Sequence, residues 1–370
     1  MLSAARAFRT VASLLGEDRQ QRFAALKSLT TPEWPAVIAI ANDHLLGPTL
    51  YAEAAKQQWL HLLPEDVRDY LALLYRRNDS RNRHIRSQLI ECVSCLNAAG
   101  IPCLLLKGAP SLIEGQDLGG RIIRDIDLLI PRSYIRQASR ELIGLGYRRW
   151  TDRPSGRHAF GVLARAGEPA ALDLHMEIIE QRHLAPTETF WGNCRRIEFE
   201  GAHAFLPSPE RQLLHVAMHE MVHNEGYIFG CVCLRALHDF SRIASQLPSE
   251  CWPALHEDLT RRKAIVPFAA MAYAAERLLG CQPWVPAAGL ASRVFYFRAA
   301  LQQNRLLPAG MNRVWMYGYK ALARHYFDPA RDKPPMMIWR MRRIGYLSSR
   351  AARLWLTGST EVQAGQERSH

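Results

Sequence analysis

The sequence predicts an α+β protein in which helical regions flank a core that contains strands. Before residue 98 and after residue 207, apolar residues recur at spacings of three and four, as they do on one face of a helix. Between these limits the chain holds short apolar runs and one alternation of period two, which are typical of strands. We therefore expect a helical region at 1–98, a core at 99–206, a helical domain at 207–356 and a disordered tail at 357–370.

The N-terminal region is expected to be helical. Thr31 precedes a proline and an acidic residue, which together give an N-cap and a first turn, and proline with acidic residues begins another helix at Pro64. A further helix runs from about Asp79 to Ala99 and ends at Gly100.

The core alternates strands with helices. A short apolar run is closed by Lys107-Gly108, glycines mark a loop near residue 120, and Gly146 ends a helix. The predicted elements are strands at 102–106, 121–130, 147–150 and 171–178, and helices at 109–114 and 133–145.

The C-terminal region is helical from Ser208, an N-cap followed by proline, to about Leu356. Its last helix, residues 336–356, carries five arginines among apolar side chains. Two interpretations remain for it. It lies peripherally on an anionic membrane or nucleic-acid surface, or it packs on the protein with its arginines in solvent.

Composition and charge set limits on partners. The formal net charge of +12 permits contact with nucleic acid, anionic lipid or a phosphate-rich substrate without specifying one. Arg-rich helices carry most of this excess and are commonly solvated faces, so a nucleic-acid partner is not expected. The N-terminus lacks the apolar segment of a signal peptide, and no uncharged run is long enough to span a bilayer, so we expect a cytoplasmic protein.

The eight cysteines are scattered through apparent helices and strands, as expected for reduced and mostly buried thiols. The alternative is a zinc or redox site at Cys92 and Cys95 or at Cys231 and Cys233. A zinc ribbon would need turn residues around each pair, whereas Cys92 and Cys95 lie inside a helical pattern.

The strand at 121–130 carries two acidic residues in an apolar run. Because strand side chains alternate between faces, Asp125 and Asp127 share one face while Ile126 and Leu128 share the other. Two carboxylates about 7 Å apart along a strand suit a divalent cation such as Mg²⁺, which prefers oxygen ligands. The alternative is an edge strand whose polar face is in water.

Groups that would contact phosphate precede this strand. Gly108 stands at a strand–helix junction, where backbone N–H groups approach an anion and the helix N-terminus favours it. Lys107 and Arg121 would add cationic contacts.

The alternation at 171–178 adds a third carboxylate. Asp173, His175 and Glu177 share one face of this strand. Three carboxylates on neighbouring strands can hold two metal ions about 3.5–4 Å apart, as in phosphate-transfer sites. Two interpretations remain for His175: it takes part in the site, or it lies on a solvated face. Glu177 extends the polar face of the strand.

These stretches together resemble the nucleotidyltransferase superfamily that includes DNA polymerase β and the aminoglycoside nucleotidyltransferases. More closely they resemble a bacterial family of uncharacterised nucleotidyltransferases, over roughly residues 35–245. The shared pattern is a Gly-containing turn with a short helix, an Asp-x-Asp strand and a later acidic strand. In this chain the pattern occurs at Leu104–Ala109, Arg121–Ile130, Leu142–Tyr147, Leu172–Met176, Leu213–His219 and Arg235–Phe240.

The resemblance implies a polymerase β-like core, a small mixed sheet with helices. It implies that Asp125 and Asp127 are metal ligands and that Asp173 is both the third ligand and a general base. The implied cofactor is Mg²⁺, as two ions, with Mn²⁺ also suitable. The implied co-substrate is an NTP such as ATP. The acceptor would be a hydroxyl group of a sugar, a small molecule or a peptide natural product.

The chain departs from the superfamily where Gly108 is followed by Ala109 instead of serine or glycine. The base of the nucleotide therefore stays open, as does the choice between nucleotidyl transfer and kinase-like phosphoryl transfer. A third alternative is a non-catalytic basic protein that binds nucleic acid or a membrane surface.

Residues of the C-terminal helices complete the expected site. His215, His219 and His223 form a stripe that is compatible with zinc, but a helix face lining the nucleotide pocket, with His219 toward the phosphates, is favoured. Arg235 and Asp239 are four residues apart, a spacing that predicts an ion pair within one helix at the pocket wall or in the framework.

Overall fold

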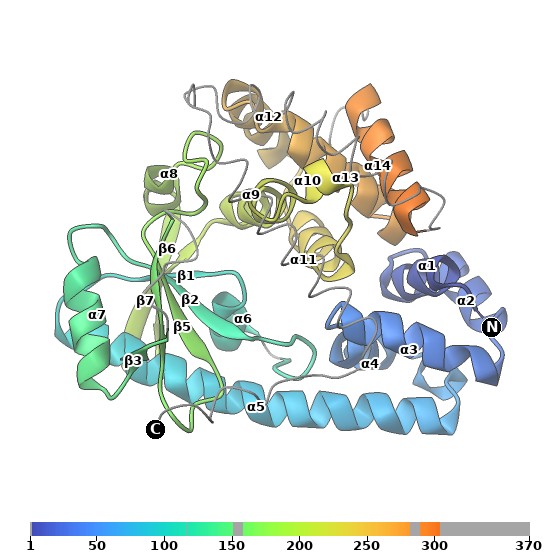
Figure 1. Ribbon diagram of the computed structural model, residues 1–370, viewed down its shortest axis with the longest axis horizontal. Coiled ribbons are helices and arrows are strands. Elements are labelled where there is room, and N and C mark those ends of the chain that lie inside the picture. Colours follow the sequence, from blue (N-terminus) through green and yellow to red (C-terminus); the bar gives the residue numbers. More distant parts are fainter. Residues whose placement is uncertain (1, 116, 151–157, 282–288, 304–370) are drawn as a thin grey trace, which may run out of the picture. The chain divides into compact units, whose positions relative to one another are not determined.

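The computed structural model describes residues 2–115, 117–150, 158–281 and 289–303 (Figure 1). Within these residues helices surround one mixed sheet, which confirms the α+β class. The N-terminal helices are α1 (Ala4–Leu15), α2 (Arg19–Lys27), α3 (Trp34–Asp43), α4 (Gly47–Lys56) and α5 (Glu65–Ala98).

In the described part of the chain the sheet has seven strands in the order β3-β4-β5-β2-β1-β7-β6. β2 pairs in parallel with β5 and β1 pairs in parallel with β7, whereas the other neighbours are antiparallel. The strands are β1 (Leu104–Leu106), β2 (Asp125–Leu129), β3 (Arg148–Arg149), β4 (Ala159–Ala164), β5 (Ala171–His175), β6 (Cys194–Phe199) and β7 (Ala202–Pro207). The short helices α6 (Ala109–Glu114), α7 (Ile135–Gly144) and α8 (Thr187–Gly192) connect them.

Helix α5 runs along one face of the sheet (Figure 1). Its side chains Ile85, Leu89 and Val93 are fully buried in one apolar cluster with Ile126 and Leu128 of β2. The predicted boundary at residues 98 and 99 therefore separates two elements that share a core, and the division into domains stays a prediction.

Two N-terminal helix predictions were wrong in detail. The helices expected to begin at Pro64 and at Asp79 are one continuous helix, α5. Asp79 lies inside this helix, and its carboxylate pairs with Arg83 one turn later, at 2.8 Å. Farther upstream, Thr30 instead of Thr31 makes a capping box with Glu33, and α3 begins after this short turn.

The hairpin of β6 and β7 was not recognised in the sequence. Its two-residue turn consists of Glu200 and Gly201, both with positive φ (48° and 79°), as a tight hairpin requires. Because β7 pairs with β1, this hairpin extends the sheet beyond the strand that precedes Lys107.

The C-terminal helices lie above the sheet in Figure 1, and α9 contacts β7. They are α9 (Pro209–Met218), α10 (Gly226–Phe229), α11 (Leu234–Ala244), α12 (Cys251–Arg261), α13 (Ile265–Leu279) and α14 (Leu290–Gln303). The predicted basic helix at 336–356 and the tail at 357–370 lie outside the described residues. None of the described helices combines the length and the apolar character that crossing a membrane requires.

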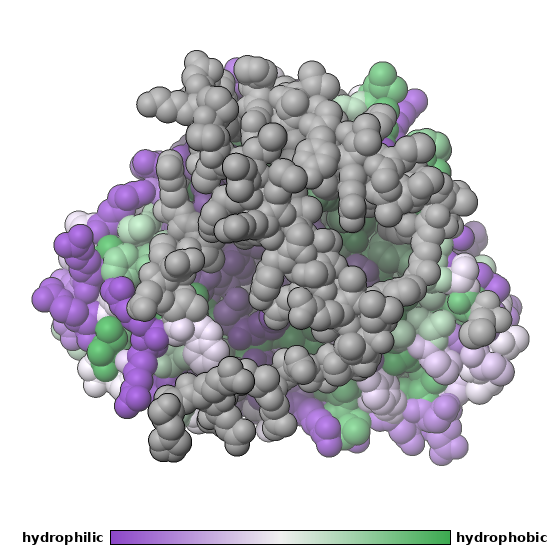
Figure 2. All heavy atoms as spheres, in the orientation of Figure 1, coloured by the Kyte–Doolittle hydropathy of each residue, from purple (hydrophilic) through white to green (hydrophobic). Residues whose placement is uncertain are grey.

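The visible surface is mixed in character. Figure 2 shows hydrophilic side chains gathered along the margin beside α7, with smaller hydrophobic areas between them. Arg136 and Arg140 of this helix, together with Glu141, lie on that side of the sheet, where α7 turns its apolar Ala138 and Leu142 inward.

Candidate active site

The two acidic strands lie side by side. β2 and β5 are parallel and in register, so that Asp127 is directly opposite Asp173. Asp125 is two residues earlier on the same face of β2. Ile126 and Leu128 are fully buried on the other face, as the alternation predicted. The local pattern therefore places the three carboxylates together on one face of the sheet.

Asp127 is the centre of a buried polar cluster. One of its oxygens, Oδ1, accepts a hydrogen bond from Lys107 Nζ at 2.6 Å and lies 2.9 Å from His175 Nε2. The same His175 nitrogen is 3.3 Å from Asp173 Oδ2. Burial raises the pKa of Asp127, but the Lys107 charge and the His175 hydrogen bond outweigh it and hold the pKa well below its usual value.

The buried cluster also shifts the pKa values of His175 and Asp125. Burial lowers the pKa of His175, but hydrogen bonds to Asp127 and Asp173 raise it to about 9. The pKa of Asp125 is raised by burial and then by the charge of Asp127. The cluster thus concentrates negative charge and compensates it with one ammonium and one imidazolium.

The donor set of this cluster fits a divalent cation. Asp127, Asp173 and His175 offer ligand atoms that all lie within 4.8 Å of one another, the one such group of three within the described residues. Asp173 Oδ1 is buried and has no hydrogen-bond partner among the residues that the structure describes. Carboxylate oxygens suit Mg²⁺ and Mn²⁺. Asp125 lies outside this tightest group, so its role as a ligand stays a prediction.

The turn after β1 is strained and closely packed. Lys107 has a positive φ of 51°, which is unfavourable for a residue with a side chain. Gly108 begins α6, and a Cβ atom there would overlap with Nη1 of Arg121. A larger residue at position 108 would therefore displace the Arg121 guanidinium from its place beside the turn.

Arg121 joins this turn to α11. Its Nε and Nη2 donate to the two carboxylate oxygens of Asp239 at 3.1 and 2.8 Å. Burial opposes the charge of each partner, but the pair raises the pKa of Arg121 and lowers that of Asp239 to about 2. The third nitrogen, Arg121 Nη1, is buried and has no hydrogen-bond partner among the described residues.

The expected ion pair between Arg235 and Asp239 was wrong. Asp239 pairs with Arg121 from the other side of the cavity, which leaves Arg235 without an ion pair within the described residues. Burial and the nearby Arg121 charge lower the pKa of Arg235. An arginine in a cavity wall that makes no direct ion pair can bind an anion.

A cavity of about 840 Å³ opens between the sheet and the helices α6, α9 and α11. Seven of the predicted site residues line it: Lys107, Gly108, Arg121, Asp125, His219, Arg235 and Asp239. Asp127, Asp173 and His175 are not part of this lining, and the first and last of them are only 1% exposed. The structure therefore brings the predicted residues into one region, with Asp125 at the cavity and Asp127, Asp173 and His175 outside its lining.

A row of imidazole rings leads from the buried cluster to His219 and His215, which line the cavity. His175 contacts His158, whose ring contacts His223, and the row continues through His219 to His215 with centroid separations of 4.5 to 5.8 Å. His219–His223 form a π-helical turn after α9, an irregularity that is frequent at functional sites. Burial lowers the pKa of His158 and of His215 to about 3, so both rings are neutral.

Sequence reasoning missed His158, and it did not recognise a metal-binding pattern that contains Glu220. His158 was overlooked because it follows a polar segment without periodicity. The residues His219-Glu220-Met221-Val222-His223 match the His-Glu-x-x-His pattern of zinc metalloproteases. They do not belong to a group of three metal-ligand candidates in the described chain, so the pattern finds no third ligand there.

Glu177 is not on the solvated continuation of β5. The strand ends at His175, and Glu177 is 3% exposed. Its carboxylate pairs with Arg132 at 2.6 Å and with Arg182 at 3.1 Å, and it accepts a hydrogen bond from the Thr187 hydroxyl. It therefore fixes the segment after β5 and is satisfied without a ligand.

Within the described residues, the two cysteine pairs do not belong to a metal-binding cluster. Cys92 is buried inside α5 against the Tyr147 hydroxyl at 3.3 Å, and burial raises the pKa of its thiol to about 12. Neither Cys92 with Cys95 nor Cys231 with Cys233 belongs to a group of three metal-ligand candidates within the described residues. Cys92 is thus a packed thiol with little thiolate character.

Comparison with known proteins supports the chemistry that this geometry suggests. A family model described as "Uncharacterised nucleotidyltransferase" matches residues 30–280, about two thirds of the chain. The match includes the cavity, both acidic strands and the helices α9 and α11. No curated protein and no solved structure matches the chain.

Proposed function

The chain belongs to the family of uncharacterised nucleotidyltransferases, and from that premise we propose that it moves a nucleotidyl group from a Mg²⁺-bound NTP to a hydroxyl group of an acceptor. The observation that carries the proposal is the register of β2 and β5. It sets Asp127 opposite Asp173, two residues from Asp125, which lines the same cavity as Arg121 and Arg235.

Asp127 and Asp173 would hold the metal, with Asp125 adding a carboxylate for a second ion. Bound Mg²⁺ would lower the pKa of the acceptor hydroxyl and neutralise charge on the leaving pyrophosphate. The unpartnered Oδ1 of Asp173 is free to accept the hydroxyl proton. The acceptor oxygen then forms a bond to the α-phosphorus, the bond from the α-phosphorus to the bridging oxygen breaks, and pyrophosphate leaves.

The phosphates of the NTP would lie against Gly108, Arg121 Nη1 and Arg235. Their charge would meet the unpartnered Nη1 of Arg121 and the Arg235 guanidinium, which makes no direct ion pair among the described residues. Unlike these arginines, Lys107 is already engaged within the protein, because its ammonium group pairs with the Asp127 carboxylate. When a cation takes over that carboxylate, Lys107 is released toward the cavity that it lines and can contact the phosphates.

We also propose a polymerase β-like arrangement for the core. The antiparallel pair β1–β2, the parallel pair β2–β5 and the helix α6 directly after Gly108 support it. The proposed acceptor is a sugar, a small molecule or a peptide with a free hydroxyl group, because the cavity has room for a second ligand beside an NTP.

The test supplies the protein with Mg²⁺, a pool of sugars and hydroxyl-containing peptides, and each NTP labelled at either the α- or the γ-phosphate. Nucleotidyl transfer moves the α-label to an acceptor, and the acceptor gains the mass of a nucleoside monophosphate. Asp173→Asn should lower the rate by about 10²–10⁴-fold because it removes the general base. Asp127→Asn should abolish transfer by removing a metal ligand.

Asp79→Asn is the control, because Asp79 is an acidic residue of α5 that pairs only with Arg83 in the described contacts and does not line the cavity. It should leave the rate unchanged. Transfer of the γ-label alone would replace the proposal with phosphoryl transfer, and full activity of either site variant would refute the metal assignment.

A further inference from the structure

The loop before β2 is held by an unusual number of buried side-chain donors. Asn82 Nδ2 donates to the carbonyl oxygens of Leu118 at 2.6 Å and of Arg121 at 2.7 Å. Asn78 Nδ2 donates to the carbonyl of Gly119 at 2.7 Å and again to that of Arg121 at 3.0 Å. Four backbone acceptor contacts thus depend on two asparagines, one helical turn apart on α5.

The remaining carbonyl of the loop is held by α4. Thr49 Oγ1 donates to the carbonyl of Gly120 at 2.7 Å. Each carbonyl of the four consecutive residues 118–121 therefore accepts a hydrogen bond from a helix side chain. Thr49, Asn78 and Asn82 are 8%, 7% and 1% exposed, so water cannot easily replace them as donors.

The loop fits closely against the same helices. A Cβ atom on Gly119 would lie 2.5 Å from the Tyr75 ring. The Tyr75 hydroxyl donates to Asp117 Oδ1, which also accepts the backbone N–H groups of Gly119 and Gly120. The loop is therefore fixed by its own turn as well as by the helices, and it has little freedom to move Arg121.

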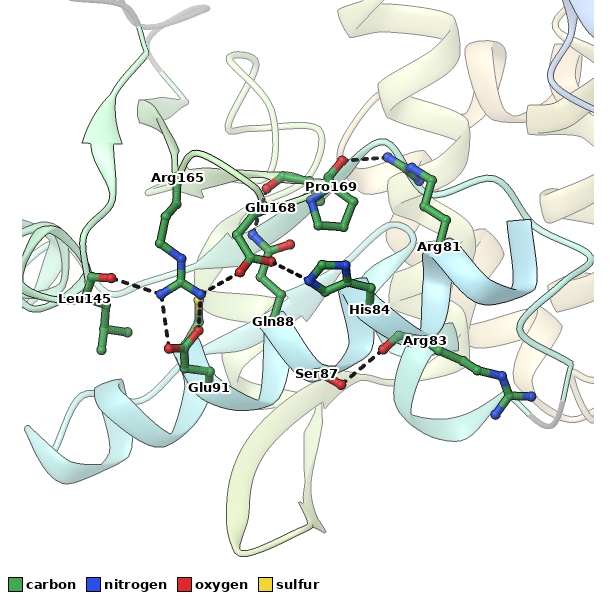
Figure 3. A network of polar contacts seen from close by, with 12 residues as sticks. Arg81, Arg83, His84, Ser87, Gln88, Glu91, Leu145, Arg165, Glu168 and Pro169 are labelled. Carbon is green, nitrogen blue, oxygen red and sulfur yellow. Dashed lines mark hydrogen bonds and ion pairs between the residues drawn. The ribbon is translucent and has the colours of Figure 1, made fainter. Parts of the chain in front are cut away.

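The same helix face also holds the segments that lead into the acidic strands. Arg81 donates to the carbonyl of Ile123, just before β2, and at 2.8 Å to that of Pro169, just before β5. Figure 3 shows Arg81 and Gln88 of α5 pointing toward the chain segment before β5, which carries the Arg165–Glu168 pair. Helix α5 is thus the common support of both strands and of the Arg121 loop.

We propose that Asn82, assisted by Asn78, is a positioning residue that sets Arg121 to bind a polyphosphate in the cavity. Both asparagines donate to the backbone carbonyl of Arg121 itself. The side chain of Arg121 pairs with Asp239, and its Nη1 stays unpartnered among the described residues, beside Gly108. This inference rests on the proposed function for its choice of ligand.

The chain contains a matched control for this role. Asn97 is also on α5, and it also makes two hydrogen bonds to backbone, donating to the His203 carbonyl at 3.0 Å and accepting the His203 N–H at 2.8 Å. It holds β7 instead of the Arg121 loop. A residue that merely supports the fold should behave like Asn97, whereas a positioning residue should change ligand affinity.

The experiment measures the affinity of the full chain for inorganic triphosphate with Mg²⁺ by calorimetry. We compare Asn82→Ala, Arg121→Ala, the double variant and Asn97→Ala. Asn82→Ala should weaken binding about tenfold, which corresponds to roughly 1.4 kcal/mol, and Asn97→Ala less than twofold. If Asn82 acts through Arg121, adding Asn82→Ala to Arg121→Ala should weaken binding less than about twofold further.

Equal affinities of Asn82→Ala and Asn97→Ala, or effects that multiply in the double variant, would overturn the inference. If Asn82→Ala does not fold, Asn78→Ala serves as the second variant with the same expectation, because it shares the Arg121 carbonyl. A wild-type chain that binds triphosphate but transfers no nucleotidyl group would refute the proposed function and leave this inference standing. A wild-type chain that binds no triphosphate would overturn it.

Discussion

At the scale of single residues, His175 has the most exceptional surroundings in the site. It is 1% exposed, and one ring nitrogen lies between the carboxylates of Asp127 and Asp173. Burial disfavours the charged imidazole, yet the two acidic partners raise the pKa of His175 to about 9. In the metal-free protein the ring is therefore positively charged at neutral pH and offsets the repulsion between the two carboxylates.

This charge gives the stability of the protein a defined pH dependence. The folded-state pKa of about 9 exceeds the unfolded value near 6.5, so His175 stabilises the fold fully below about pH 6.5 and loses this effect as the pH rises through about 9. In EDTA, His175→Gln should therefore reduce the free energy of unfolding most at about pH 6 and least above about pH 9. Urea unfolding of both proteins across this range measures the difference.

His84→Gln is the control for this prediction, because His84 is exposed and pairs with Glu168 at the surface, at 3.4 Å. It should have a small effect at every pH. An effect of His175→Gln that stays constant from acid to alkaline pH would mean that the buried ring is neutral.

Which site residues could be predicted depends on how local their geometry is. The shared face of Asp125 and Asp127 follows from the two-residue period of a strand, and the sequence alone defines it. The pairing of Arg121 with Asp239 joins residues that are 118 positions apart, and no local pattern encodes it. Local spacing favoured Arg235 as the partner instead, and tertiary contact overrode it.

At the scale of elements, competing local signals limited how accurately helices and strands could be predicted from the sequence. Asp79 and Ser80 look like a helix start, but without a proline or glycine in residues 65–98 the helix continues through them. The hairpin of β6 and β7 has a Glu-Gly turn, which lacks the Asn-Gly signature of such turns. Helix 109–114 was predicted at its observed bounds because its end signals agree, whereas the strand expected at 121–130 is observed only at Asp125–Leu129.

The role of α5 as a support can be tested at Gln88. Its amide Nε2 donates to the Tyr147 hydroxyl at 2.9 Å and to the Ala170 carbonyl at 2.7 Å, and the side chain is 2% exposed (Figure 3). Gln88→Leu keeps the size but removes the donor, which should lower the free energy of unfolding by about 1–3 kcal/mol. Equilibrium unfolding in urea measures this loss.

The neighbouring Ser87 provides the comparison. Its hydroxyl is exposed and donates only to the Arg83 carbonyl, at 3.2 Å. Ser87→Ala should change the unfolding free energy by less than about 0.5 kcal/mol. A loss of similar size in both variants would show that the buried contacts of Gln88 contribute nothing specific.

At the scale of the whole molecule, the site depends on three regions of the chain. The sheet supplies the carboxylates, α11 supplies Arg235 and Asp239, and α5 supplies the donors beneath the Arg121 loop. The apolar cluster under β2 contains α5 side chains as well as those of the strands: Ile85, Leu89, Cys92, Val93 and Leu96. The strand-containing core is therefore incomplete without the helix that precedes it.

This dependence predicts that the fragment 99–206 does not fold cooperatively, whereas the fragment 60–206, which adds α5, does. Removing five fully buried α5 side chains forfeits on the order of 10 kcal/mol of apolar burial, which is as large as the whole stability of a typical domain. The loop carbonyls also lose the donors Asn78 and Asn82. Circular dichroism during urea unfolding should give a sigmoidal transition only for the longer fragment. A transition in 99–206 as steep as that in 60–206 would show that the core folds by itself and that α5 only covers it.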